Sequence, residues 1–436
     1  MKKIIFALMF SSIVITAQTR ELTLQESLEL GLKNSIELQI ANSKIIKAGA
    51  VESEITSSMF PKISFNAAYR RLSDVHPFQL NLPMFPQPVT IQETILDNYS
   101  LSATIEQPLF TGFKLSSLKS AASLNKEAER ILFNKERMNK IEDIKKAFWH
   151  FYNSEKIVAL LKENLKSLKN HLNDTEKFLE NGLVTKNDFL KLKVEVSNIE
   201  LQLLEAQNNK NIARTVFNKT IGLPLNQKTQ IINKETTGTI YLADYTQLLA
   251  EALKNRSELK STSLRVKALE EKKTASQSDW FPQLFAFGNF YYSKPNQRFL
   301  PIENKFNDSW DVGVALKWSL WNWGGTSAKV QQAEEDLFQA KKTLELLKKA
   351  IELDVYNNYL KLQNAIKKIN LTKMQIESAK ENFRITELKF NQQLVTSTEL
   401  IDAEAALLNA KTMYETAKVE YKLCKVALEK SVGRIR

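Results

Sequence analysis

The chain of 436 residues has few of the residues that interrupt regular structure or hold small folds together. Only 11 glycines and 10 prolines occur, and with 25% charged and 43% apolar residues this favours a helix-rich protein over a disordered one. The single cysteine, Cys424, excludes an internal disulfide. Three histidines lack the spacing of a metal site, and the motifs of a nucleophile elbow, a phosphate-binding loop and a zinc-protease helix are missing. No catalytic, cofactor or metal site is predicted, and we do not expect an enzyme.

Apolar runs long enough to cross a membrane as a helix are missing beyond the N-terminus. The chain begins Met1-Lys2-Lys3, continues with an apolar stretch and reaches Ala17, which is typical of a signal peptide over residues 1–17. A membrane anchor is the alternative, although the stretch is short for a span. An exported chain without a spanning helix is either free in the periplasm or inserted as a β-barrel, because only helices and closed barrels satisfy their backbone in lipid.

The charge balance is basic, with 61 Lys and Arg against 49 Asp and Glu and a formal net charge of +12. Such an excess is one indication of nucleic-acid binding. Here the lysines are spread along predicted helices and alternate with glutamates, which favours the solvated faces of long helices. Because export also removes the chain from nucleic acid, we expect no such partner.

One pattern occurs twice along the chain and predicts an internal two-fold repeat. The matched segments are residues 32–38 with 253–259, Phe60-Pro61 with Phe281-Pro282, residues 107–110 with 318–321, residues 183–185 with 394–396, and Ile221-Gly222 with Val432-Gly433. The first copy carries about ten additional residues around positions 76–88, judged from the shift of the offset. We therefore expect a first copy over residues 18–225, a polar linker over 226–238 and a second copy over 239–436.

Each copy reads as a helix, two short strands, a long helix, a tip and a returning helix. In the last strand Val312, Val314 and Leu316 face one way and the residues between them face the other. The strand over residues 283–292 is aromatic on both faces, which leaves its orientation open. Strands of about ten residues with one apolar face are typical of a transmembrane barrel, and a soluble hairpin with one wet face is the alternative.

The helices are predicted to be much longer than those of globular proteins. Residues 115–179 contain neither glycine nor proline, which allows a helix of about 100 Å at 1.5 Å per residue. Apolar residues then recur at steps of three and four, which predicts coiled-coil packing of the helix with its return partner. The heptad positions are Val158, Leu161, Leu165, Leu168, Leu172, Thr175 and Leu179, followed by Phe189, Leu192, Val196, Ile199, Leu203 and Ala206.

Four strands are too few to close a barrel, since bacterial barrels begin at about eight strands. An open sheet would leave unpaired edges in lipid, so the chain is expected to share its barrel with copies of itself, three of which give about 12 strands. Aromatic residues gather where strands meet helices, and they are interpreted as an interfacial girdle or as a core at that junction. They are Phe60, Phe110, Phe113, Trp280, Phe281, Trp318, Trp321 and Trp323.

This arrangement resembles the TolC-like outer-membrane efflux protein family. The resemblance covers nearly the whole mature chain and is carried by the repeat, by Phe-Pro before each first strand, by residues 108–112 (PLFTG) and by residues 181–185 (NGLVT). It implies a fold that is mainly α with a membrane β-barrel portion, with four strands and long coiled-coil helices per protomer. It also implies a homotrimeric duct in the outer membrane that extends into the periplasm. Its partners would be a periplasmic adaptor protein and an inner-membrane pump.

The resemblance also assigns candidate residues to the two helical tips. The acidic residues that ring the closed periplasmic mouth in the family match Glu399 and Asp402, with Asp188 as the counterpart in the first hairpin. A solvated charge in the first helical turn is the alternative for Glu399 and Asp402. An arginine that links the two tips in one family member is replaced here by a valine, so that latch is absent or moved. The adaptor-docking candidates are Asn181, Gly182, Leu183, Val184, Thr185, Gln393, Leu394, Val395 and Thr396.

Gln393 occupies the place of Gly182, so the two turns are predicted to differ in shape. The function expected from all these features is passive export through an outer-membrane channel of an efflux or type I secretion system. A periplasmic coiled-coil adaptor or scaffold without a barrel is the alternative. The four alternating strands speak against it, because such a scaffold does not need them.

Overall fold

The computed structural model describes residues 20–76, 78–80, 83–87, 89–92, 94–233 and 243–435. The predicted signal peptide, residues 1–17, lies outside these residues, as does the end of the predicted linker, residues 234–238. Among the described residues, no helix is both long and apolar enough to cross a membrane.

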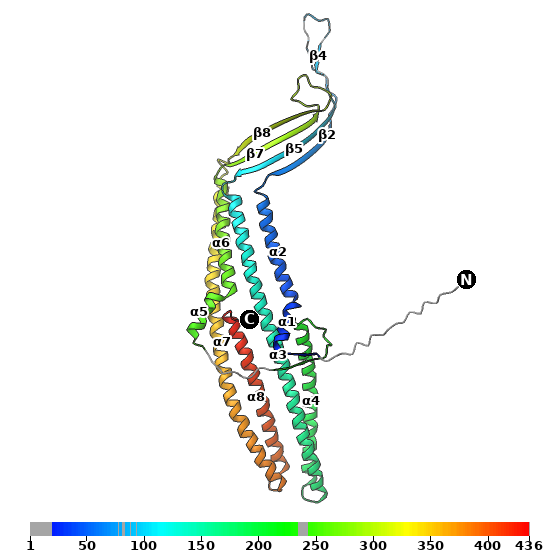
Figure 1. The fold of residues 1–436 in the computed structure, drawn as a ribbon, viewed down its shortest axis with the longest axis vertical. Helices are drawn as coiled ribbons and strands as arrows, with labels where there is room; N and C mark the ends of the chain where they lie inside the picture. The colour runs from blue at the N-terminus through cyan, green and yellow to red at the C-terminus, as the bar shows by residue number, and fades with distance from the viewer. Residues whose placement is uncertain are drawn as a thin grey trace, which may run out of the picture. The chain divides into compact units, whose positions relative to one another are not determined.

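The helices occur in two matching sets (Figure 1). The first set comprises α1 (Leu24–Lys33), α2 (Ile36–Ser57), α3 (Lys114–Glu180) and α4 (Lys186–Thr220), and the second α5 (Tyr245–Asn255), α6 (Ser257–Gln277), α7 (Gly325–Asn391) and α8 (Ser397–Ser431). Helices α3 and α7 each contain 67 residues, and α4 and α8 each contain 35. Equal lengths in the same order are what an internal repeat predicts, while the exact boundaries of the copies stay a prediction.

The chain folds into two compact units that do not correspond to the two copies. One unit is built from Met1–Ala41, Leu132–Leu259 and Leu347–Arg436, and the other from Asn42–Ile131 and Lys260–Leu346. Each unit therefore draws on both copies of the sequence pattern, and the long helices α3 and α7 contribute to both units.

The second unit contains a four-stranded antiparallel sheet in the order β2-β5-β7-β8. Its strands are β2 (Lys62–Arg71), β5 (Asp97–Phe110), β7 (Gln283–Lys294) and β8 (Asn307–Lys317), and β2 and β7 begin directly after Pro61 and Pro282. The register places Ile63, Ile105, Gly288 and Val312 in one row across the sheet. The four strands confirm the predicted pattern.

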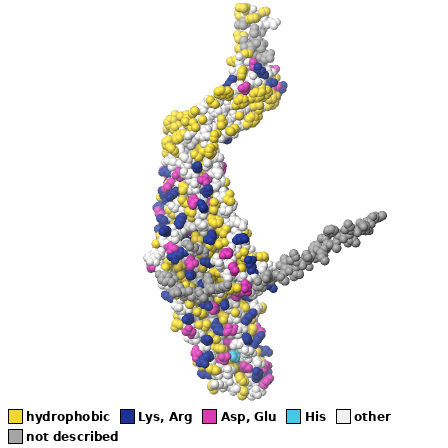
Figure 2. Space-filling view, viewed as in Figure 1, with side chains coloured by type: hydrophobic (Ala, Val, Ile, Leu, Met, Phe, Trp, Pro, Cys, Tyr) yellow, Lys and Arg dark blue, Asp and Glu magenta, His cyan; other side chains and the backbone are white. Residues whose placement is uncertain are grey.

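One face of this sheet is apolar along its whole width (Figure 2). Opposed residues of neighbouring strands share a face, so the register assigns Phe290 and Tyr292 of β7 to the same side as Trp310 and Val312 of β8. The orientation of β7, which the sequence left open, is thereby settled. The opposite face carries Thr104, Asn289 and other polar side chains.

Two short strand pairs were not predicted from the sequence. Strand β1 (Arg20–Leu22) pairs in parallel with β6 (Thr229–Ile231), and β3 (Phe78–Leu80) pairs antiparallel with β4 (Val89–Gln92). Because β6 lies within residues 226–238, part of the predicted linker is a strand, held through the buried side chain of Thr229, whose hydroxyl donates to Asn218 Oδ1 at 2.8 Å. The β3–β4 pair accounts for the additional residues of the first copy.

The core of the first unit includes two clusters that lie along the first helical hairpin. An aromatic cluster is formed by Phe148, Trp149, Phe151 and Phe217, which are at most 3% exposed. Further along, α3 and α4 pack through the residues of the predicted heptads, which confirms the coiled-coil interpretation for the first hairpin. The buried members are Val158, Leu161, Leu168, Leu192, Val196, Ile199 and Ala206, with Ile401 and Leu408 of α8 packed against them.

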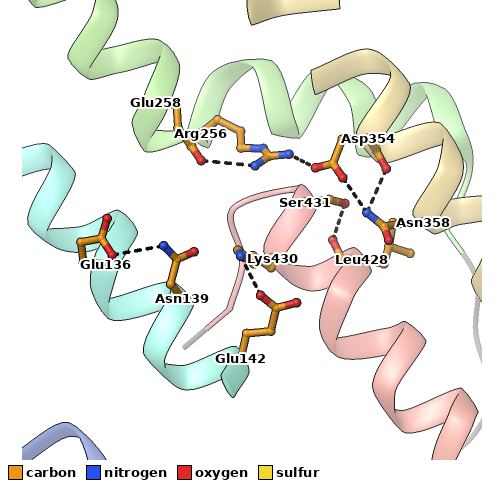
Figure 3. A network of polar contacts seen from close by, with 10 residues as sticks. All are labelled: Glu136, Asn139, Glu142, Arg256, Glu258, Asp354, Asn358, Leu428, Lys430 and Ser431. Atoms are coloured by element: carbon orange, nitrogen blue, oxygen red, sulfur yellow. Dashed lines mark hydrogen bonds and ion pairs between the residues drawn. The ribbon is translucent and has the colours of Figure 1, made fainter. Parts of the chain in front are cut away.

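Ion pairs with one buried partner each, Glu142 or Arg256, join helices of the first unit that are distant in the sequence (Figure 3). The carboxylate of Glu142 on α3 accepts from Lys430 at 2.6 Å and from Lys146 at 2.8 Å. Burial alone would raise the pKa of Glu142, but these two ammonium groups hold that pKa below its usual range. Nearby, Arg256 donates to Asp354, which links the α5–α6 junction to α7.

The aromatic residues at the strand–helix junctions are exposed, which does not fit the interpretation of a buried core. The rings of Phe110 and Phe113 meet edge to face at 5.4 Å, and Phe113 meets Phe281 at 6.0 Å, yet the three residues are 36–56% exposed and form a surface cluster rather than a buried core. Trp321 and Trp323 are 74% and 89% exposed and form a surface available to an interface. The interpretation as an interfacial girdle stays a prediction, and it is compatible with this exposure.

Candidate functional site

The two helical tips have the same backbone ending, and the prediction that they differ was wrong. After α3, Gly182 has φ +71 and Leu183 N donates to Phe178 O at 2.8 Å. After α7, Gln393 has φ +60 and Leu394 N donates to Lys389 O at 2.9 Å. This hydrogen-bonded ending requires one left-handed residue, which costs a residue with a Cβ roughly 1–2 kcal/mol but does not forbid it.

The tip carboxylates begin the returning helices as capping groups. Thr185 N donates to Asp188 Oδ2 at 3.2 Å, and Asp188 N donates to Thr185 Oγ1 at 3.2 Å. At the second tip, Thr396 N donates to Glu399 Oε2 at 2.9 Å and Glu399 N donates to Thr396 Oγ1 at 3.3 Å. Each pair forms a reciprocal capping box, so Asp188 and Glu399 have a structural role in the isolated chain. Asp402 lies exposed about one turn further along α8.

The structure brings the two predicted docking segments together at one end of the first unit. All of their residues except Asn181 line a common hollow of about 580 Å³, together with Asp188 and Glu399, whereas Asn181 Nδ2 donates to Lys177 O at 2.8 Å. Phe178 and Phe390 also line the hollow, with ring centroids 6.2 Å apart, and Lys191 Nζ donates to Thr398 Oγ1 at 3.2 Å from one hairpin to the other. Leu183 at the rim is 51% exposed, as is suited to contact with another protein.

A buried polar cluster lies in the same hairpin region, and sequence reasoning missed it. Glu404 of α8 is 4% exposed and accepts a hydrogen bond from Asn164 Nδ2 of α3 at 3.1 Å. The buried ring of His171 lies against Phe383 and Phe390, and burial lowers its pKa. A signal was present in the sequence, because Glu404 stands four residues after Leu400 and three before Leu407, on the buried face of α8.

The polar face of the sheet has its own hydrogen-bond network. Thr104 Oγ1 donates to Asn289 Oδ1 and Asn289 Nδ2 donates to Asp311 Oδ1, both at 2.8 Å, across three neighbouring strands. Arg298, in the segment between β7 and β8, donates to Asp311 Oδ2 at 2.7 Å. Asn296 anchors the same segment by donating to Ser309 Oγ at 3.0 Å. This segment therefore folds back onto the polar face.

No group of three or more His, Cys, Asp or Glu residues within the described part of the chain is arranged to hold a metal ion. The candidate functional features are instead three surfaces. Two are the apolar face of the sheet and its polar face, which the segment between β7 and β8 covers in part. The third is the hollow between the helical tips, which carboxylates surround.

Comparison with known proteins gives one family and one fold. The family model described as "Outer membrane efflux protein" matches residues 28–223 and 248–434, in two segments that follow the two copies. The chain is 22% identical over 335 residues to the alkaline protease secretion protein AprF of Pseudomonas aeruginosa, covering 74% of this chain and 67% of that protein. It is 20% identical over 385 residues to the outer membrane protein TolC of Vibrio cholerae, covering 87% of this chain and 83% of that protein.

Solved structures agree with this assignment at the level of the fold. The outer membrane protein VceC of Vibrio cholerae superposes with a TM-score of 0.77 at 17% identity, covering 94% of this chain and 96% of that one. The CmeC outer membrane channel of Campylobacter jejuni gives a TM-score of 0.76 at 15% identity, covering 94% and 85%.

Proposed function

The chain belongs to the outer membrane efflux protein family, and we propose that it forms the exit duct of a tripartite efflux or type I secretion system. Proteins of this family are channels of the outer membrane and not enzymes, and the outer membrane is the location of this chain. In the proposed role the duct is passive, so the energy for export comes from a partner in the inner membrane.

The single observation that carries the proposal is the two-faced sheet with open edges. Its apolar face exposes Ile63, Phe65, Val312 and Val314 by 63–76%, a surface suited to lipid. Strands β2 and β8 are the outer strands of the four and each has a neighbour on one side only. Unpaired strand edges are not viable in hydrocarbon, so β8 of one copy must pair with β2 of the next. Three copies supply about 12 strands, enough for a closed barrel.

The helical tips supply a second surface of the proposed duct. The hollow shared by residues 182–185 and 393–397 combines exposed leucines with polar groups, which is the composition of a docking surface for an adaptor. We propose further that Glu399 and Asp402 from three copies form acidic rings at the periplasmic mouth, with Asp188 supporting the closed form. In the isolated chain Asp402 is exposed, and Glu399 is exposed while its carboxylate also caps α8 through Thr396 N.

The proposed cargo includes both proteins and small molecules, because the comparisons with known proteins point to both secretion and efflux. AprF is named for secretion of an alkaline protease, and the family model is described by efflux. The chain is similar to both kinds, so we propose an export duct that serves either a protein secretion or a small-molecule efflux partner.

The test is the mass of the full-length protein extracted from outer membranes in mild detergent. We expect about three times the mass of the mature chain, together with β-structure. A stable monomer that retains its full β-structure would overturn the shared barrel. Recovery of the protein from the soluble periplasmic fraction would instead favour the coiled-coil scaffold.

A further inference from the structure

The buried contact between Asn164 and Glu404 joins two different helical hairpins. Asn164 lies on α3 of the hairpin α3–α4, and Glu404 lies on α8 of the hairpin α7–α8. Both residues line a cavity of about 320 Å³ whose other walls include Leu161, Ile199 and Ile401. A buried carboxyl group thus lies in a contact between hairpins that combines apolar side chains with Glu195, Gln202 and Asn409.

The hydrogen bonding of this contact is incomplete for an ionised carboxylate. Glu404 Oε1 accepts from Asn164 Nδ2 at 3.1 Å, but Glu404 Oε2 and Asn164 Oδ1 are buried without a donor at hydrogen-bonding geometry, and the Ser167 hydroxyl supports the ionised carboxylate less than burial opposes it. Buried oxygen atoms without a donor are unfavourable, and an unpaired buried charge is more so. A proton on Glu404 removes the charge and turns one acceptor into a donor, so the protonated acid suits this contact better.

Among the titratable groups around Glu404, Glu387 and Glu195 add to this preference and Lys411 opposes it. The titratable groups are Glu163 and His171 of α3, Glu195 of α4, Glu387 of α7 and Lys411 of α8. The ammonium group of Lys411 is engaged with Glu163 at 2.8 Å, and His171 Nε2 lies 3.9 Å from Glu387. Burial, reinforced by Glu387 and opposed by the Ser167 hydroxyl, raises the pKa of Glu404 to about 7.

We propose that Glu404 is a proton-binding site through which pH controls the packing of the two hairpins, the acid form holding them together and the ionised form loosening them. This inference goes beyond the proposed function and does not rest on it, because it concerns the packing of α3 and α8 within one chain. In a duct, however, the same step would set the ease with which the hairpins separate near the mouth.

Proton linkage gives the direction and the size of the effect that pH should have on the packing of the two hairpins. A carboxyl whose pKa is higher in the packed state than when exposed stabilises packing at low pH, and this stabilisation is lost as the pH rises toward the packed-state value. With values of about 7 packed and about 4.5 exposed, linkage gives a loss of about tenfold in the packing equilibrium between pH 6 and pH 8.

Hydrogen–deuterium exchange on the full chain in detergent tests this proposal. Protection factors, corrected for the intrinsic pH dependence of exchange, are measured for peptides around residues 157–172 and 400–411 from pH 5.5 to 8.5. For the wild type we expect a fall of about tenfold between pH 6 and pH 8. In Glu404→Gln, which is neutral at every pH, the fall should be absent. Glu377→Gln removes an exposed charge from α7 and should retain the wild-type fall.

A second variant keeps the test decisive if Glu404→Gln does not fold. Asn164→Leu removes the donor to Glu404 Oε1, which disfavours the ionised form of Glu404 further. The fall in protection factor of this variant should therefore occur at higher pH than in the wild type. The proposal is overturned if the wild type shows no fall, if Glu404→Gln shows the wild-type fall, or if Asn164→Leu leaves the midpoint unchanged. None of these outcomes alters the mass expected for a trimer, so the two proposals are tested separately.

Discussion

Substitution of Val312 by arginine tests the assignment of the apolar sheet face. Val312 lies in the middle of β8, in the row that contains Ile63, Ile105 and Gly288, and is 73% exposed. In the proposed barrel this side chain faces lipid, where an arginine near the midplane costs about 2–4 kcal/mol. Three copies in a trimer give a total of about 6–12 kcal/mol, if the costs add.

A cost of this size is comparable to the whole stability of many domains, so Val312→Arg should prevent assembly. The assay is the amount of trimer in the outer-membrane fraction, measured by gel filtration in mild detergent. Ala315→Arg is the matched control, because Ala315 is also exposed on β8 but belongs to the polar face, opposite Phe285 of β7. Val314→Arg and Leu316→Arg should behave like Val312→Arg. Equal effects of Val312→Arg and Ala315→Arg would refute the assigned faces.

Gln393→Gly should stabilise the protein by about 1 kcal/mol, because glycine adopts the left-handed conformation without a Cβ clash; an unchanged or lower midpoint of thermal unfolding would contradict this. Glu399→Gln combined with Asp402→Asn should lower the cation selectivity of the channel, and Asp188→Asn should change it less; reversal potentials in planar bilayers measure this, and unchanged selectivity would place the carboxylates outside the pore. Glu142→Gln should destabilise the protein by about 2 kcal/mol at pH 7, since it removes the charge that its two lysines contact. The pKa of Glu142 is lowered in the fold, so its contribution exists above the unfolded value of 4.5 and is lost as the pH falls through the lowered value. The difference in unfolding midpoint between wild type and variant should therefore shrink in acid, and a constant difference would mean that charge is not the cause.

The regular parts of the fold were predictable because their signals are local. Absence of glycine and proline over residues 115–179 allowed the length of α3 to be predicted almost to the residue. The heptads identified the buried face of the first hairpin, and Phe-Pro marked the start of β2 and β7. These patterns depend on helix and strand periodicity alone, which one chain segment expresses by itself.

The parts that were missed depend on contacts between distant segments. The face of β7 was open because its aromatic residues occur at both parities, and only pairing with β5 and β8 fixes it. The turn at Gln393 was mispredicted because the hydrogen bond from Leu394 to Lys389 outweighs the preference for glycine. Glu404 was missed because a carboxylate on a helix is usually solvated, and its burial requires the second hairpin.

Candidate residues of both tips line one hollow in the structure, as expected if the two tips form a single binding surface. Their roles as a gate and as a docking site stay predictions, because they involve neighbouring protomers and partner proteins. The capping boxes at Thr185 and Thr396 nevertheless explain why an acidic residue stands three positions later in each copy.

The division of the chain into units that each combine both copies has a consequence for dissection of the protein. A fragment that ends near residue 225 would carry two strands of the sheet and one long hairpin, and would lack the β7 neighbour of β5 and the α8 partner of Asn164. Such a half-length chain is not a self-sufficient module. It would have to recruit a second half to complete both units, and six half-chains would be needed to rebuild what three whole chains form in the proposed trimer. Fusion of the two halves into one polypeptide therefore fixes their stoichiometry and lets each half diverge, as the β3–β4 pair and the glutamine at the second tip already show.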